Sequence, residues 1–111
     1  MPATPRAIDL THAAARAAAE RKAEEIIAID VADRLALSDV FLVVSGRSDR
    51  QVRAIVDSID EAMIKAGAKR RTREGYDEGH WVLVDYGDVV VHVQQADDRE
   101  FYALERLWAD C

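Results

Sequence analysis

The stretch Trp81–Val93, WVLVDYGDVVVHV, decides the fold of this chain because it predicts a β-hairpin. Two runs rich in β-branched residues flank Asp85–Asp88, and the glycine there suits a tight two-residue turn that needs a positive φ. With Tyr86 and Gly87 as the loop, Asp85 would face Asp88, and Trp81 would face His92. Side chains alternate along each strand, so the hairpin should have two different faces.

The first predicted face is entirely aliphatic and suits a hydrophobic core; it comprises Val82, Val84, Val89, Val91 and Val93. The second face carries Trp81, Leu83, Val90 and His92, with Asp85 and Asp88 at the turn end. Aromatic and aliphatic groups bordered by charge are typical of protein-binding patches, and a Lys or Arg of a partner would relieve the two opposed carboxylates. The alternative is that a helix of the same chain covers this face, with Trp81 as an ordinary core residue.

The length and composition predict one folded domain without membrane contact. A chain of 111 residues is too short for two domains, and 50% hydrophobic with 32% charged residues is typical of globular proteins. No apolar run is long enough to span a bilayer, and residues 1–5 lack the features of a secretory signal, so we expect a cytoplasmic protein. The single cysteine, Cys111, allows no internal disulfide and no cysteine-based metal site.

The charge of the chain narrows the class of partner. A formal net charge of −6 argues against direct non-specific nucleic-acid binding, which requires many Lys and Arg residues to neutralise phosphates. On a ribonucleoprotein, we expect such a chain to dock on a basic protein. The basic run Lys69–Arg73 is a local exception, which we interpret as a solvated edge strand whose charges discourage edge-to-edge pairing.

Three helices are predicted from composition and capping patterns. An alanine-rich helix should run from about Thr11, as N-cap, to Glu25, after a flexible tail of residues 1–9. A capping box at Ser48–Gln51 begins a second helix, which Gly67 ends. A capping box at 97–100 begins a third, with an apolar side of Phe101, Leu104, Leu107 and Trp108.

The strands predicted between these helices complete an α/β fold. Besides the hairpin, strands are expected at residues 26–31, at 40–44, where the apolar run suggests a central strand, and at 68–74. This order predicts a single domain over residues 10–111, with a mixed five-stranded sheet and flanking helices.

No constellation of catalytic residues is recognisable in the sequence. Neither Ser45 nor Ser48 lies in a nucleophile-elbow pattern. Asp85 and Asp88 lack the third oxygen ligand that a magnesium site would need, and no partner residue is placed to make His92 a general base. We therefore predict no catalytic residue, no metal site and no cofactor.

Several segments, in their order and spacing, carry a resemblance to a known family: Asp39–Gly46, Ser48, Arg50–Val52, Ala54–Ile55, Glu74–Gly75, Trp81–Val93 and Arg99–Trp108. The sequence resembles the ribosomal silencing factor family, also called RsfS or Iojap-like, from about Ala14 to Trp108. It departs from the family pattern in its longer alanine-rich start and in its Ala-Asp-Cys end.

The resemblance implies a nucleotidyltransferase-like fold that lacks the catalytic acids of a transferase. It implies a non-enzymatic translation repressor that binds the large ribosomal subunit through the universal protein uL14, blocks association with the small subunit, and often forms homodimers. The alternatives are a nucleotidyltransferase-like nucleotide-binding protein or enzyme, and an adaptor of the toxin–antitoxin or assembly type. The partner-binding residues that we predict are Glu74, Trp81, Leu83, Asp85, Tyr86, Asp88, Val90 and His92.

Overall fold

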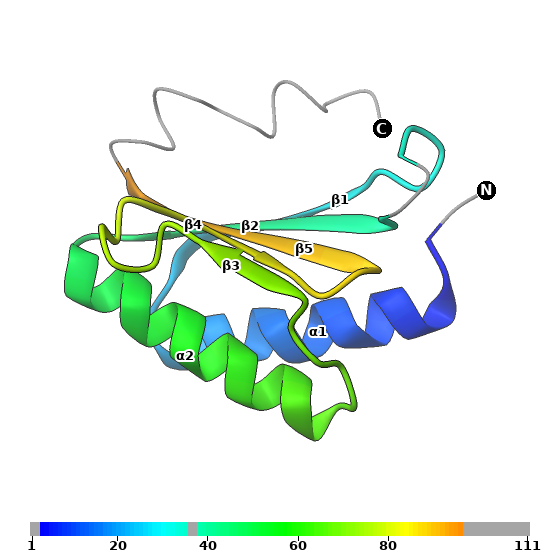
Figure 1. Cartoon of the computed structure of the whole chain (residues 1–111), viewed down its shortest axis with the longest axis horizontal. Coiled ribbons are helices and arrows are strands. Elements are labelled where there is room, and N and C mark those ends of the chain that lie inside the picture. The colour runs from blue at the N-terminus through cyan, green and yellow to red at the C-terminus, as the bar shows by residue number, and fades with distance from the viewer. Residues whose placement is uncertain (1–2, 36–37, 97–111) are drawn as a thin grey trace.

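A computed structural model describes residues 3–35 and 38–96 and confirms a mixed five-stranded sheet. The elements are α1 (Pro5–Glu20), β1 (Glu24–Asp30), β2 (Val40–Gly46), α2 (Asp49–Lys65), β3 (Thr72–Glu74), β4 (Trp81–Asp85) and β5 (Val89–Gln95). The strand order is β1-β2-β5-β4-β3, in which β2 and β5 are parallel and the other neighbours are antiparallel. Helices α1 and α2 lie side by side against one face of this sheet (Figure 1).

Helix α1 begins earlier than the sequence suggested, and the predicted N-cap at Thr11 is wrong. Thr4 is the N-cap, because its hydroxyl oxygen accepts a hydrogen bond from the Ala7 N–H at 3.1 Å, and Pro5 occupies the first helical position. Thr11 lies inside the helix, where its hydroxyl donates to the Ala7 carbonyl at 2.7 Å. Residues 5–9 are therefore part of α1 rather than of a tail, and the helix ends at Glu20.

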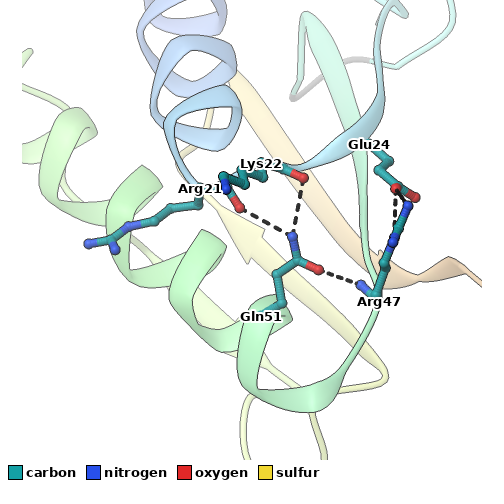
Figure 2. A network of polar contacts seen from close by, with 5 residues as sticks. All are labelled: Arg21, Lys22, Glu24, Arg47 and Gln51. Atoms are coloured by element: carbon teal, nitrogen blue, oxygen red, sulfur yellow. Dashed lines mark hydrogen bonds and ion pairs between the residues drawn. The ribbon is translucent and has the colours of Figure 1, made fainter.

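At the start of α2 the predicted N-cap, Ser48, is confirmed, but the Gln51 side chain bonds to a different backbone N–H from that of a standard capping box. The Ser48 hydroxyl accepts from the Gln51 N–H at 3.1 Å, as expected. The Gln51 side chain accepts from the backbone N–H of Arg47 at 2.7 Å, and its amide donates to the carbonyl oxygens of Arg21 and Lys22 (Figure 2). Gln51 thereby joins the turn after α1 to the turn after β2.

The main hydrophobic core lies between the two helices and the sheet. All five valines of the predicted aliphatic face belong to it, which confirms that part of the hairpin prediction. Small buried residues of α1, including Ala7, Ala14 and Ala18, let this helix approach the sheet closely. A smaller cluster lies on the opposite face, where Ile29, Val31 and Val43 pack with Ile27, Leu35 and Phe41.

The register of the β4–β5 hairpin differs from the predicted one. The Tyr86 N–H donates to the Val89 carbonyl at 3.0 Å, so the two-residue loop is Gly87-Asp88 and not Tyr86-Gly87. The Asp85 carboxylate accepts from the Gly87 N–H at 2.7 Å and holds Gly87 at the first loop position, with a φ of +91°. Each residue of β4 therefore faces a residue two positions further along β5 than predicted, and the two faces keep their composition.

The predicted third helix, with Phe101, Leu104, Leu107 and Trp108, lies outside the described residues, as does Cys111. No helix within residues 3–35 and 38–96 is long and apolar enough to cross a membrane.

Gly75 should tolerate no side chain, since it has a φ of +81° and a Cβ there would collide with the Trp81 carbonyl oxygen. We expect Gly75→Ala to lower the free energy of unfolding by at least about 2–3 kcal/mol, measured by urea denaturation. Gly67→Ala is the matched control, because Gly67 has a similar φ of +86° and a Cβ there would meet only the Arg6 side chain, at an ordinary contact distance of 3.9 Å. That change should cost about 1 kcal/mol of backbone strain. Equal losses in the two variants would contradict this account.

Candidate functional site

The face of the sheet opposite α1 and α2, called here the second face, carries most of the predicted partner-binding residues. Trp81, Leu83 and Asp85 of β4 lie beside Gln94, His92 and Val90 of β5 respectively, and Glu74 of β3 lies beside Leu83. Phe41, Val43 and Ser45 of β2 continue this face on the other side of β5. The structure thus brings together Glu74, Trp81, Leu83, Asp85, Val90 and His92.

Tyr86 does not belong to the second face. Its side chain is buried in the core on the helix side, and its hydroxyl donates to the Asp60 carboxylate of α2 at 2.9 Å. Burial, reinforced by the bond to Asp60, raises the pKa of Tyr86 far above its ordinary value. The tyrosine therefore fastens the hairpin turn to α2 and cannot contact a partner that covers the second face.

The predicted pair of opposed carboxylates does not form. Asp85 lies beside Val90 and binds the Gly87 N–H, whereas Asp88 is an exposed residue of the turn. The corrected register is the physical reason, because it moves Asp88 into the two-residue loop. The turn end remains acidic, although its two carboxylates act separately.

An aromatic cluster organises the centre of the second face. The Trp81 indole N–H donates to Nδ1 of His92 at 3.2 Å, although the two residues are not directly opposite as predicted. Phe41 meets the imidazole edge-on, with ring centroids 5.0 Å apart and an interplanar angle of 61°. These contacts fix the orientation of the indole ring.

The imidazole at the centre of this cluster is neutral at pH 7. His92 is only 5% exposed, and burial lowers its pKa to about 4. Because Nδ1 accepts the indole hydrogen bond, the proton of the neutral ring lies on Nε2. Within residues 3–35 and 38–96, that buried N–H has no hydrogen-bond partner, nor has either polar atom of the buried Gln94 side chain. The second face therefore carries a local cost in stability.

The accessible part of the second face lies at the border between β3 and β4. An open groove with a volume of about 300 Å³ is lined by Glu74, Gly75, Trp81 and Leu83. Trp81 and Leu83 are partly exposed there, whereas Val90 and His92 are buried. The predicted patch is thus divided into partly exposed residues on β4 and buried residues on β5.

Comparison with known proteins identifies the family. Residues 4–111 match the family described as "Ribosomal silencing factor during starvation". This chain belongs to the ribosomal silencing factor (RsfS) family. The match covers nearly the whole chain, including residues 36–37 and 97–111, which lie outside the described part.

Individual relatives in the RsfS family agree with this assignment. The ribosomal silencing factor RsfS of Bacillus subtilis strain 168 is 45% identical over 97 residues, which are 87% of this chain and 82% of that protein. A solved structure of a Chromobacterium violaceum protein superposes with a TM-score of 0.88 at 36% identity, covering 92% of this chain and 85% of that one. The mouse protein named mitochondrial assembly of ribosomal large subunit protein 1 is 32% identical over 80% of this chain and 40% of its own length.

Sequence reasoning missed two residues that shape the site of this RsfS-family chain. Phe41 packs on His92 from β2, and its position on the same face follows only once β2 is known to pair with β5 in parallel. Gly75 lines the groove because its Cα lies against the backbone of Trp81. A glycine followed a few residues later by a strand is a weak signal, since loops often contain glycine.

No group of three or more His, Cys, Asp or Glu side chains that could hold a metal ion occurs within the part of the chain that the structure describes.

The buried imidazole predicts a specific dependence of stability on pH. In the unfolded chain His92 has an ordinary pKa near 6.5, so the unfolded state binds a proton that the folded state does not as the pH falls from 6.5 towards 4. This contribution to stability is therefore complete above pH 6.5 and is lost on acidification. It should amount to about 1.4 kcal/mol between pH 7.5 and pH 5.5.

The variant His92→Phe isolates this effect, because phenylalanine keeps a ring beside Phe41 and has no titrating group. Urea denaturation of both proteins at pH 7.5 and 5.5 should show the wild type losing about 1.4 kcal/mol more than the variant. Parallel pH profiles would contradict the burial of a neutral imidazole.

Proposed function

We propose that this chain is a non-enzymatic translation repressor in the cytoplasm, which binds the large ribosomal subunit through its second face and sterically prevents the small subunit from joining. The observation that carries the proposal is the partly exposed pair Trp81 and Leu83 beside an open groove, on the face of the sheet opposite α1 and α2. Membership of the RsfS family supports the ribosome as the target, and the name of the mouse relative supports the large subunit.

Trp81 is suited to be the main anchor because its orientation is already fixed. Its N–H is bound to His92, so the indole presents its apolar ring to the groove without an unsatisfied donor. Leu83 is the neighbouring apolar contact on the same strand, and it lies beside His92 of β5. Phe41 packs against the His92 imidazole. A tryptophan anchor surrounded by weaker contacts is the usual arrangement of an interface hot spot.

The charged rim indicates the chemistry of the partner. Glu74 lines the groove, and Asp85 and Asp88 lie at the turn end of the same hairpin. Together with the net charge of −6, these carboxylates favour a basic protein surface, for which we propose uL14 of the large subunit. Occupation of the surface that the small subunit needs would be sufficient for repression, so no chemical step is required.

A homodimer in the absence of ribosomes belongs to the same proposal, since the family resemblance implies one. Sedimentation equilibrium of the free protein measures it directly.

The central test is Trp81→Ala. Loss of a central tryptophan anchor should cost about 2 kcal/mol or more, which corresponds to roughly 30-fold weaker binding to purified large subunits. Co-sedimentation over a range of protein concentrations gives the affinity, and circular dichroism checks that the variant is folded. Ile64→Ala is the matched control, because Ile64 is 61% exposed on α2, away from the second face. Binding of Trp81→Ala that equals wild type would overturn the proposed docking surface.

A further inference from the structure

The basic run between α2 and the sheet edge has an arrangement that its sequence did not reveal. Lys69, Arg70, Arg71 and Arg73, called here the basic edge, contribute four of the fifteen Lys and Arg residues of a chain with a net charge of −6. β3 is one of the two edge strands of the sheet, and all three of its residues are exposed. Charge on an edge strand discourages aggregation. That role alone does not explain how the guanidinium groups are held.

Contacts other than ion pairs position two of these arginines. The Arg71 N–H donates to the Asp85 carbonyl at 2.8 Å, and its guanidinium lies against Gly87 of the hairpin turn. The Arg73 guanidinium stacks on the Tyr76 ring, 3.9 Å from the centroid. Arg70 is 3.6 Å from the Asp60 carboxylate. Within the described residues, Lys69, Arg71 and Arg73 form no ion pair, so their charges are available to an anion.

Tyrosine hydroxyls reduce the competition from nearby carboxylates. The Tyr76 hydroxyl donates to both oxygens of Asp57, and the Tyr86 hydroxyl donates to Asp60. The bond to Asp57 also raises the pKa of Tyr76, so the phenol stays protonated as a donor. Asp57 and Asp60 of α2 are thus hydrogen-bonded to tyrosines, although both keep their negative charge.

The basic edge borders the second face. Arg71 touches the same turn that carries Asp88. Glu74, which lines the groove, directly follows Arg73, but Arg73 lies beside Val84, so the two side chains leave β3 on opposite faces. A partner that covers the groove and extends around the β3 edge would therefore meet these cations. Three arginines favour phosphate as the anion, because a guanidinium can donate two hydrogen bonds to phosphate oxygens. The Tyr76 ring also offers a surface on which a base could stack.

We propose that the basic edge binds the phosphate backbone of ribosomal RNA next to the protein on which the second face docks. This inference rests on the proposed binding to the large subunit. The overall charge of −6 opposes tight binding to free RNA, so the contact acts as a second attachment once the hairpin is docked.

The test compares the salt dependence of binding for two matched triple variants. Lys69→Gln/Arg71→Gln/Arg73→Gln removes the three cations of the basic edge that have no ion pair. Arg16→Gln/Lys22→Gln/Lys65→Gln removes three exposed cations elsewhere, from α1, from the turn after α1 and from the end of α2. If three phosphates are contacted, the slope of log K against log salt for purified large subunits should become less steep by about 2 in the first variant. The second variant should keep the wild-type slope. Equal slopes in both variants would overturn the proposal.

Hydroxyl-radical footprinting of the ribosomal RNA distinguishes RNA from an acidic protein as the anion. Wild type should protect a short run of riboses that the first triple variant leaves exposed. A flatter salt slope without any change in the footprint would assign the edge to an acidic protein surface and overturn the RNA contact.

The same series separates this inference from the proposed docking face. Unchanged binding of Trp81→Ala, together with a flatter slope in the first triple variant, would contradict the docking face and retain the RNA contact. A chain that does not bind large subunits at all would contradict both.

Discussion

Burial of the valine face of the β4–β5 hairpin against α1 and α2 is the constraint on which the rest of the structure depends. Val82, Val84, Val91 and Val93 have no exposed surface, and each buried valine contributes on the order of 1.5 kcal/mol or more. Because strand residues alternate, this burial directs Trp81, Leu83 and His92 to the opposite side. The composition of the candidate site is therefore a direct consequence of core packing on the other face.

The arrangement of side chains on the second face lowers the stability of the fold. A core built only for packing would not bury the His92 N–H and the Gln94 side chain, which have no hydrogen-bond partner in the part of the chain that the structure describes, since each such group costs about 1–3 kcal/mol. The imidazole accepts the indole N–H and packs on Phe41, so it orients Trp81 from behind. Departures from ideal packing of this kind are expected where a surface serves recognition.

The sequence predicted which residues share a face far better than it predicted their exact partners. Alternation of valines with other residues determines the face of each side chain, and a register error of two positions leaves it unchanged. The register itself depends on the Asp85 carboxylate binding the Gly87 N–H, and several loop lengths fit the same four residues. The sequence did not determine the face of Tyr86, because a residue beside a turn can point to either one; the structure places it on the helix side, bound to Asp60.

The helix boundaries, too, could be predicted from the sequence only in part. Ser48 was correctly predicted as the N-cap of α2, since it is followed by a strong apolar period. For α1, the choice between Thr4 and Thr11 depends on tertiary contacts: the Ala3 and Thr4 N–H groups bind the carboxylates of Asp30 and Asp39. The pair Thr4-Pro5 is a local signal for this start, since proline is favoured at the first helical position, but the acceptors that hold it come from β1 and from the residue before β2.

Two tyrosines connect the hairpin region to neighbouring positions on α2, and this has a consequence for the energetics of recognition. Tyr86 joins the turn to Asp60, and Tyr76 joins the loop before β4 to Asp57, one helical turn away. A loop held at two points on a rigid helix loses little conformational entropy when a partner covers it. Much of this loop is thus already ordered in the free protein. Complex formation should therefore proceed without refolding of the hairpin.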